Sequence, residues 1–469
     1  MQFLLALATL RVATTLLSPE EMGKVSLVLT TIAFFAMFLV NPVGMFINRR
    51  LHAWQANGSA RAYLERYIGY LVAVAMIAAI VLPLFAMTGW VNFGIPIVWL
   101  VALACGSLVF NTINQTSIPS LNMLGDSRNF VMLSVLTLAA SFACAVMLVK
   151  SIQASAQYWV LGLLLGQMLL AVVGTKIFLA RLGQEGGRPA TATGLQKRNV
   201  SVLFEFAWPV ALAAGLGWVQ GQGYRYILES ELGLAQLGLF VAGYSISAGL
   251  IAGFESVLTT YFQPRLYQDA NKGRPDEQAK AWRNYASAVI PSLILTVMLI
   301  MLLAPELTRL FLGERFQAAA DFVLWGALAE AARVLTGVYS LIAHVFMRTR
   351  WLVLPTTAGA VLSMVACLLL IPRLGAIGAG IGLAVAGFVV VVLMHVLLAS
   401  RAGGGIGVRQ ISKALAVGAA LWLCVWSLRA LLGNESWAAL GGIIVMAGSA
   451  YLGALYWFLR RHLGNKVRI

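Results

Sequence analysis

The chain has 469 residues, of which 60% are hydrophobic and only 11% are charged. A soluble domain carries about a quarter charged residues, so this composition excludes an ordinary soluble protein. The net charge of +16 is spread over many short polar segments, which argues against nucleic acid as a partner. Apolar runs of about 20 residues recur instead, and each can cross the hydrocarbon of a bilayer as a helix.

In chain order, the apolar runs predict an all-α polytopic membrane protein. The fourteen predicted spans are residues 1–17, 24–47, 67–89, 94–120, 129–149, 157–180, 204–228, 234–262, 284–304, 318–347, 351–371, 375–399, 411–431 and 436–459. The first run has neither a basic lead nor a convincing cleavage site. We therefore expect a first helix whose start is missing or misassigned, rather than a secretory signal.

The basic residues predict the orientation of these spans. Of the 33 Lys and Arg residues, 24 fall in alternate loops, at the span ends that border them or in the C-terminal tail, beginning with the loop after the second span. Six fall in the opposite loops or at the span ends that border those. Because cytoplasmic loops carry the excess of Lys and Arg, both termini are predicted to face the cytoplasm. The remaining three, Arg11, Arg225 and Arg333, lie inside predicted spans.

The loops leave little room for an enzyme. The segment 181–203 is polar and rich in Gly, Thr and Ala, which is typical of a linker between two halves. The chain has no Walker A loop, no HExxH or GxSxG motif and no cluster of metal ligands, so we expect no catalysis, no cofactor and no metal. The four cysteines lie in apolar runs and are expected to be packing residues.

Two stretches 215 residues apart indicate an internal repeat. "LLSPEEMGKVSLVLT" (16–30) and "LGLAQLGLFVAGYS" (232–245) each end a helix, turn, and open the next helix with a glycine, Gly23 or Gly238. Arg11 and Arg225 precede these glycines by 12 and 13 residues. Repeated halves joined by a linker are typical of transporters that bind their substrate between the halves. The alternative is that two unrelated hairpins share a glycine turn.

Three segments carry a family resemblance. "LLSPEEMGKVSLVLTTIAFFAMFLVNPVGMFINRRL", "ELGLAQLGLFVAGYSISAGL" and "IPRLGAIGAGIGLAVAGFVVVVLMHVLLASR" resemble the polysaccharide transport (Wzx-type) flippases of the multidrug/oligosaccharidyl-lipid/polysaccharide exporter superfamily. The resemblance covers most of the chain, in order and spacing. It implies two pseudo-symmetric lobes facing a central cavity and an additional C-terminal helix pair. The expected divisions are lobe 1–180, linker 181–203, lobe 204–400, and residues 401–469 with helices 13, 14 and a basic tail.

The resemblance also implies a function. Such a protein moves undecaprenyl-pyrophosphate-linked oligosaccharide from the cytoplasmic to the periplasmic leaflet by alternating access, for O-antigen or exopolysaccharide synthesis. It would lie in the bacterial cytoplasmic (inner) membrane, with membrane lipids around it and a polysaccharide polymerase and chain-length regulator as partners. Many members read Asp-Arg where this chain reads Tyr224-Arg225, so the resemblance does not support ion coupling at that position.

The charges inside the spans are the candidate site residues. A charge in hydrocarbon needs a partner or a wet cavity, and Arg offers a permanently charged donor fork for phosphate. We expect Arg225 and its repeat counterpart Arg11 to bind pyrophosphate, with Tyr224 and Gln222 beside them, and Arg333 to line the same cavity. The alternative for Arg225 and Arg11 is snorkelling to the interface, or a pair of Arg225 with Glu229 or Glu231.

Two carboxylates are candidates for ion coupling. Glu330 lies three residues before Arg333, on the same helix face, and forms either a self-satisfied pair or a part of the cavity wall. Glu255 has no basic neighbour in sequence, which predicts a proton or cation site or a long-range pair with Arg333.

Two rival functions remain at this stage. An ion-coupled multidrug or metabolite exporter of the same superfamily would be expected to have several carboxylates in one lobe, and the predicted spans of the first lobe hold none. A membrane-embedded glycosyltransferase or polymerase would be expected to have a large external loop, and the longest predicted external segment, near 305–317, is short.

Overall fold

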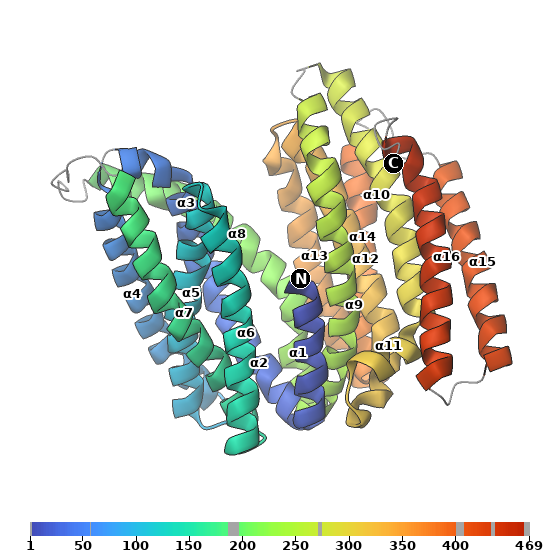
Figure 1. Cartoon of the computed structure of the whole chain (residues 1–469), viewed down its shortest axis with the longest axis horizontal. Coiled ribbons are helices and arrows are strands. Elements are labelled where there is room, and N and C mark those ends of the chain that lie inside the picture. Colours follow the sequence, from blue (N-terminus) through green and yellow to red (C-terminus); the bar gives the residue numbers. More distant parts are fainter. Residues whose placement is uncertain are drawn as a thin grey trace. The chain divides into compact units, whose positions relative to one another are not determined.

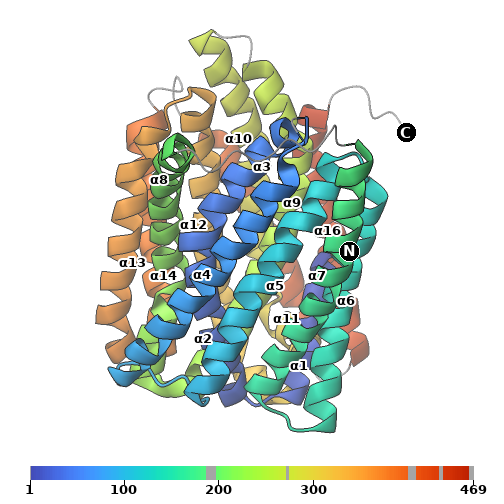
Figure 2. The same cartoon turned by 90° about the vertical axis from the view of Figure 1, so that its left-hand side faces the viewer.

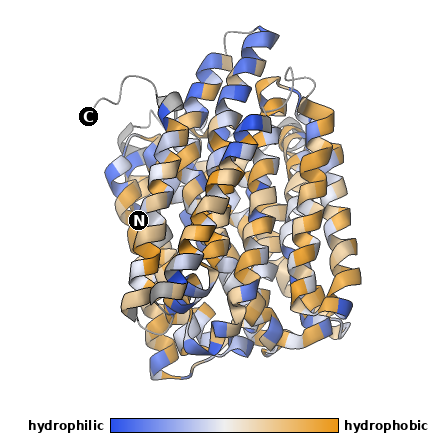
Figure 3. Ribbon diagram, turned by 90° about the vertical axis from the view of Figure 1, so that its right-hand side faces the viewer, coloured by the Kyte–Doolittle hydropathy of each residue, from blue (hydrophilic) through white to orange (hydrophobic). Residues whose placement is uncertain are grey.

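The computed structural model describes residues 2–56, 58–185, 197–270, 274–399, 408–432 and 437–463, and its regular elements within these ranges are all helical (Figure 1). Among them, 11 helical segments are long and apolar enough to cross a membrane. Figure 3 shows hydrophobic residues along the middle of the helices and hydrophilic residues gathered at their ends. The predicted all-α membrane fold is thus confirmed. Five of the basic residues that were used to predict the orientation lie outside the described ranges, at positions 188, 272, 401, 466 and 468.

Backbone contacts divide the chain into two units. The N-terminal unit holds Met1–Leu5 and Val12–Gly238, and the C-terminal unit holds Ala6–Arg11 and Leu239–Ile469. The helix α1 (Gln2–Leu16) therefore contributes to both units. The other elements of the N-terminal unit are α2 (Pro19–Phe35), the π-helical turn η1 (Ala36–Val40), α3 (Asn41–Ala56), α4 (Ala60–Met87), α5 (Ile97–Met123), α6 (Ser127–Ser151), α7 (Ala156–Glu185) and α8 (Lys197–Gln222).

The C-terminal unit begins inside α9 (Tyr224–Ala270), which is bent at Gly233, where φ is 82°. Only a residue without a Cβ adopts this left-handed backbone readily, so the glycine permits the change of direction. The elements that follow are α10 (Pro275–Leu302), α11 (Ala304–Phe311), η2 (Glu314–Ala319), α12 (Ala320–Val345), η3 (Thr349–Leu352), α13 (Val353–Leu374), α14 (Ala376–Leu398), α15 (Val408–Leu432) and α16 (Trp437–Leu463).

Several helices are longer than the predicted spans. The segment after the second span is not a loop, because α3 continues to Ala56 and α4 begins at Ala60. Arg50 and Arg66 fall in a loop between the predicted spans, but in the structure they lie on helices. Hydropathy ends a span where charges begin, whereas a helix can continue as long as its charged side chains reach water. The segment near 305–317, which was predicted to be a short external loop, is likewise folded, into α11 and η2.

Each unit contains a helix triplet packed in the same way. In the N-terminal unit α5 and α6 both pack on α7, and in the C-terminal unit α12 and α13 both pack on α14 (Figures 1 and 2). Gly162 and Gly166 of α7 lie against the backbone of α6, where a Cβ on either would overlap Ala145 or Ser141. Such small-xxx-small spacing lets membrane helices approach closely.

The C-terminal triplet uses the same device. Gly378 and Gly382 of α14 lie against α13, where a Cβ on Gly378 would overlap the Leu370 carbonyl and one on Gly382 would crowd Cys367. These glycines follow Gly162 and Gly166 by 216 residues, against 215 for Gly23 and Gly238. The offsets, which differ by one residue, and the similar packing support the internal repeat.

The repeat-related glycines Gly23 and Gly238 face each other. A Cβ on Gly23 would overlap the Leu234 carbonyl, and a Cβ on Gly238 would overlap the Pro19 carbonyl. Each glycine thus faces the residue four positions before the other one. This reciprocal pattern is that of a two-fold-like crossing of α2 with the part of α9 that follows Gly233.

The turn between α5 and α6 is held by Asp126. Its carboxylate caps α6 by accepting from the Asn129 backbone N–H (3.2 Å) and the Asn129 side-chain amide (2.8 Å). It also accepts from Nε of Arg181 on α7, at 2.8 Å. The Asn129 amide, followed by the Asn129 backbone N–H and Arg181, lowers the pKa of Asp126 below its ordinary value.

We expect Asp126 to make stability depend on pH. Since its pKa is lower in the folded than in the unfolded chain, its contribution is fully present above the unfolded pKa of about 4 and is lost as pH falls through the folded pKa. Purified wild type should therefore unfold at a higher temperature than Asp126→Asn at pH 7, and the gap should narrow as pH falls below about 4. A gap that widens as pH falls below this value would contradict this assignment. Glu65→Gln, in an exposed pair with Arg61, is the control and should show little difference at either pH.

Candidate functional site

Arg225 lies in the first turn of α9 and contacts α2. Its Nη1 donates to the Thr30 hydroxyl at 2.7 Å, and its Nε donates to the Tyr224 hydroxyl at 3.3 Å. Among the described residues it makes no ion pair. Glu229 accepts instead from the backbone N–H of Asn92, at 3.2 Å. The alternative of an Arg225–Glu229 pair is therefore wrong for this conformation, and Arg225 keeps an uncompensated charge held by two neutral hydroxyls.

The neighbours of Arg225 differ in their access to a ligand. Tyr224 is 0% exposed and positions Arg225 through its hydroxyl, so in this conformation it does not itself face a ligand. The side-chain oxygen of Gln222, three residues before Arg225 in the chain, is buried and accepts no hydrogen bond from the described residues. Burying an acceptor without a hydrogen-bond donor costs free energy, so binding of a ligand that donates to this oxygen would be favourable.

Aromatic side chains pack around the same contact. The Trp218 indole donates to the Thr30 carbonyl at 3.2 Å, and the Tyr226 hydroxyl lies 2.7 Å from that of Thr31. The rings of Trp218 and Tyr226 are 5.9 Å apart, and Trp218 also lies edge-on to Phe34. These rings pack α8 and α9 against α2, and the Thr30 hydroxyl of α2 holds the Arg225 guanidinium.

Arg11 occupies a different setting from Arg225. It belongs to the part of α1 that packs with the C-terminal unit, and its Nη1 donates to the Arg309 carbonyl of α11 at 3.1 Å. The structure therefore gives Arg11 a carbonyl partner where Arg225 has hydroxyls. That Arg11 is the repeat counterpart of Arg225 and binds the substrate stays a prediction.

Arg333 joins two carboxylates from different helices. Its Nε donates to Glu330 at 2.6 Å, and its Nη2 donates to Glu255 of α9 at 2.8 Å. The Tyr244 hydroxyl donates to the other oxygen of Glu330, also at 2.6 Å. The Glu330 side chain is 8% exposed and that of Arg333 is 49% exposed. Of the two interpretations of Glu255, the long-range pair with Arg333 is the one observed, and the ionised cluster carries one excess negative charge.

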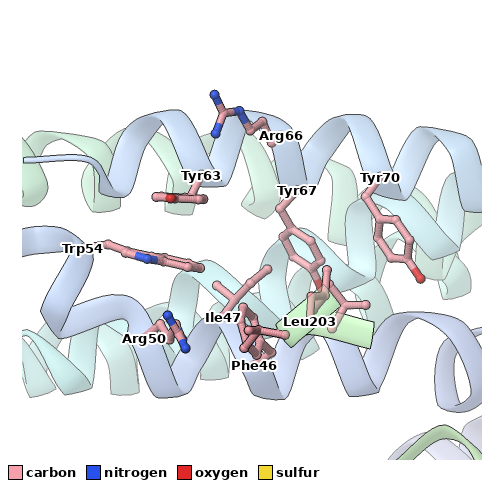
Figure 4. Close-up of a pocket in the computed structure, with 11 residues that line it drawn as sticks. Phe46, Ile47, Arg50, Trp54, Tyr63, Arg66, Tyr67, Tyr70 and Leu203 are labelled. Atoms are coloured by element: carbon pink, nitrogen blue, oxygen red, sulfur yellow. The ribbon is translucent and has the colours of Figure 1, made fainter. Parts of the chain in front are cut away.

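A further group of residues was not recognised in the sequence. Arg50 and Trp54 on α3 and Tyr63 and Arg66 on α4 line one cavity of about 250 Å³ (Figure 4). The rings of Trp54 and Tyr63 are stacked at 4.1 Å with an interplanar angle of 11°. The Arg66 guanidinium lies over the other face of Tyr63, 5.5 Å from its centre, so that Tyr63 stands between an indole and a cation.

A signal for this cavity existed in the sequence. Tyr63, Tyr67 and Tyr70 follow the i, i+4, i+7 spacing of one helix face. The predicted spans leave residues 48–66 in a loop, where Arg50 and Arg66 indicate only the orientation of the chain. Helical spacing has no meaning in a loop, so the pattern was not recognised. A helix through residue 63 would have placed the three rings together.

Two solved structures share this architecture. A lipid II flippase MurJ in an inward closed conformation matches with a TM-score of 0.64 and 12% identity, over 98% of this chain and 97% of its own. An inward-facing multidrug resistance MATE family transporter of the MOP superfamily matches with a TM-score of 0.64 and 17% identity, over 86% of this chain and 95% of its own. At these identities the likeness establishes the fold, which is that of polytopic helical transporters.

The sequence family is established more directly. Residues 12–321 match the family model of the polysaccharide biosynthesis proteins, and the chain belongs to that family. No curated protein sequence matches the chain.

Proposed function

We propose that the protein is a flippase that moves undecaprenyl-pyrophosphate-linked oligosaccharide from the cytoplasmic to the periplasmic leaflet by alternating access, for O-antigen or exopolysaccharide synthesis. Membership of the polysaccharide biosynthesis family and a fold like that of a lipid II flippase support this. In this proposal the protein lies in the bacterial inner membrane with both termini in the cytoplasm. A polysaccharide polymerase with its chain-length regulator consumes the product.

The observation that carries the proposal is the uncompensated charge of Arg225. A guanidinium in a membrane segment needs an anionic partner or water, and the described residues offer it two hydroxyls and the face of the Tyr224 ring but no carboxylate. A pyrophosphate supplies the missing negative charge in the geometry that guanidinium prefers. The unsatisfied side-chain oxygen of Gln222, three residues earlier in the chain, can accept a hydrogen bond from a sugar hydroxyl. Tyr224 orients Arg225. We also propose Arg11 and Arg333 as substrate-binding cations, and Arg333 would have to be released from Glu255 and Glu330 to act in this way.

The test compares Arg225→Gln with Arg225→Lys in cells that lack the chromosomal gene. Wild type should clear lipid-linked repeat units from the cytoplasmic leaflet, and Arg225→Gln should be slower by about 10- to 100-fold, the cost of one or two charge-assisted hydrogen bonds. Arg225→Lys keeps the charge and should fall between them. Arg373→Gln, an exposed arginine on α13, makes the same charge change and should behave as wild type.

The outcomes separate the two interpretations of Arg225. If Arg225→Gln clears the lipids as fast as wild type at equal expression, Arg225 is a snorkelling anchor and the phosphate role fails. If deletion of the gene accumulates no such lipids, the flippase proposal itself fails.

One observation favours the alternative function, an ion-coupled multidrug or metabolite exporter. The cluster of Glu255, Glu330 and Arg333 has one excess negative charge, which a proton or a cation can balance. The same cluster can drive a flippase by ion coupling. Transport that stops when the ion gradient is collapsed, with a drug rather than a lipid-linked sugar as substrate, would favour the exporter.

A further inference from the structure

The cavity beside Arg50 and Arg66 adjoins an apolar groove in the same unit. The cavity shares three lining residues, Val43, Tyr70 and Leu203, with a second depression of about 430 Å³. That depression runs between η1 with α3 on one side and α8 on the other. Its other lining residues are all apolar, and they include Phe38, Pro42, Phe204, Trp208 and Leu212. One end of the combined hollow is therefore cationic and aromatic, and the other end is hydrocarbon-like.

The π-helical turn shapes the apolar end. Pro42 has no N–H to donate to the preceding turn, which disrupts the regular bonding of this helix. The chain forms η1 there, and the Tyr70 hydroxyl donates to the Leu39 carbonyl at 2.7 Å. Phe38 packs into the space left by Gly215 of α8. Tyr70 lines both depressions, and its hydrogen bond to Leu39 holds its side chain where the two depressions meet.

The cationic end has no anion of its own. Arg50 and Arg66 are the only charged residues among those lining the two depressions, and neither is paired with a carboxylate in the described parts of the chain. The Nη1 atom of Arg66 is buried and has no hydrogen-bond acceptor there. The Arg50 guanidinium lies 5.0 Å from the centre of the Phe46 ring. Both cations are held over aromatic rings, which leaves their N–H donors for a ligand.

We propose that this hollow is a binding site for an anionic glycerophospholipid of the surrounding membrane. Its phosphate is held by Arg50 and Arg66, beside the Trp54–Tyr63 stack, and an acyl chain lies in the groove towards Phe38 and Leu212. Guanidinium groups fit phosphate oxygens, the groove fits a hydrocarbon chain, and basic pockets at helix ends are typical sites for lipid headgroups. A zwitterionic headgroup fits poorly, because its ammonium would meet two cations. Bulk lipid is the occupant because it is the most abundant ligand of this chemistry at a membrane helix.

The test is native mass spectrometry of the full chain in detergent, titrated with phosphatidylglycerol or phosphatidylcholine of the same acyl chains. The double variant Arg50→Gln/Arg66→Gln should bind phosphatidylglycerol about tenfold more weakly or worse, because it loses the charge-assisted bonds to phosphate. The matched control is Arg49→Gln/Arg61→Gln, which changes the same charge on the same two helices at exposed positions that line neither depression. It should bind within about twofold of wild type.

A second variant tests the groove and leaves both cations in place. Ala207→Phe fills the depression and should also weaken phosphatidylglycerol about tenfold, while Ala213→Phe, outside the lining, should not. Thermal unfolding checks that each variant is folded. The proposal is overturned if the control pair weakens binding as much as the test pair, or if phosphatidylcholine binds as tightly as phosphatidylglycerol. It is also overturned if polyprenyl phosphate displaces phosphatidylglycerol at equal concentration, since the occupant would then be a carrier lipid. None of these readouts depends on transport.

Discussion

Gly238→Ala should destabilise the protein by about 3 kcal/mol or more, the upper range for overpacking a tight contact. The added methyl group would overlap the Pro19 carbonyl and approach the Gly23 backbone nitrogen at 2.8 Å. These are backbone atoms of a helix start, which cannot rotate away as the end of a long side chain does. Gly23→Ala should have a similar effect through the Leu234 carbonyl. The measurement is the thermal unfolding temperature of the purified protein in detergent.

The control for this prediction lies in a neighbouring helix. A Cβ on Gly217 of α8 would meet nothing within 4 Å, so Gly217→Ala should be neutral or slightly stabilising. Because Gly23 and Gly238 share one contact, the double variant should cost less than the sum of the single variants. Equal unfolding temperatures for Gly238→Ala and Gly217→Ala would show that the two helices do not cross here.

Arg333→Gln should destabilise the protein by about 1–3 kcal/mol. Removing one partner of a buried ion pair costs about 3–5 kcal/mol, and the half-exposed guanidinium reduces this value through solvent screening. The cost arises mainly at Glu330, which is 8% exposed and would keep only the hydrogen bond from Tyr244. Glu255→Gln should cost less, because that side chain is 28% exposed.

A double-mutant cycle checks the origin of this effect. Glu330→Gln in the Arg333→Gln background removes the stranded charge, so it should restore part of the stability as measured by thermal unfolding. If the second change instead adds its full cost, the two side chains are not coupled. Tyr244→Phe offers a matched control, since it removes one hydrogen bond from Glu330 but leaves the ion pair intact.

Local chemistry was enough to predict much of the fold. Runs of apolar residues must become helices in a bilayer because every backbone polar group needs a partner inside its own segment. This reasoning placed the spans and the turn before Gly238 without any tertiary information. It failed where helices continue past the hydrocarbon, as at Arg50 and Arg66. Hydropathy indicates which residues prefer lipid to water, and it does not indicate where the helical backbone ends.

The candidate site was predicted in part. Glu330 and Arg333 are three residues apart, so helical geometry alone joins them. Glu255 is 78 positions before Arg333, and only the packing of α9 beside α12 determines that they meet. Arg225 was found because a charge stands out in an apolar run. Its actual partner, Thr30, was not predicted, because a threonine in a membrane helix has no distinguishing signal in sequence.

By itself, then, the sequence determined the helical membrane class and the residues whose charge is costly in hydrocarbon, because these follow from composition and from spacing along one helix. The internal repeat was predicted from the spacing of glycines and arginines. The tertiary structure showed that no carboxylate in the described ranges pairs with Arg225. It alone decided that Gly23 faces Gly238 and that Arg50, Trp54, Tyr63 and Arg66 surround one cavity. These contacts join residues that belong to different helices. Their geometry depends on how closely and at what angle two helices pack, which small residues and aromatic rings from distant parts of the chain set together.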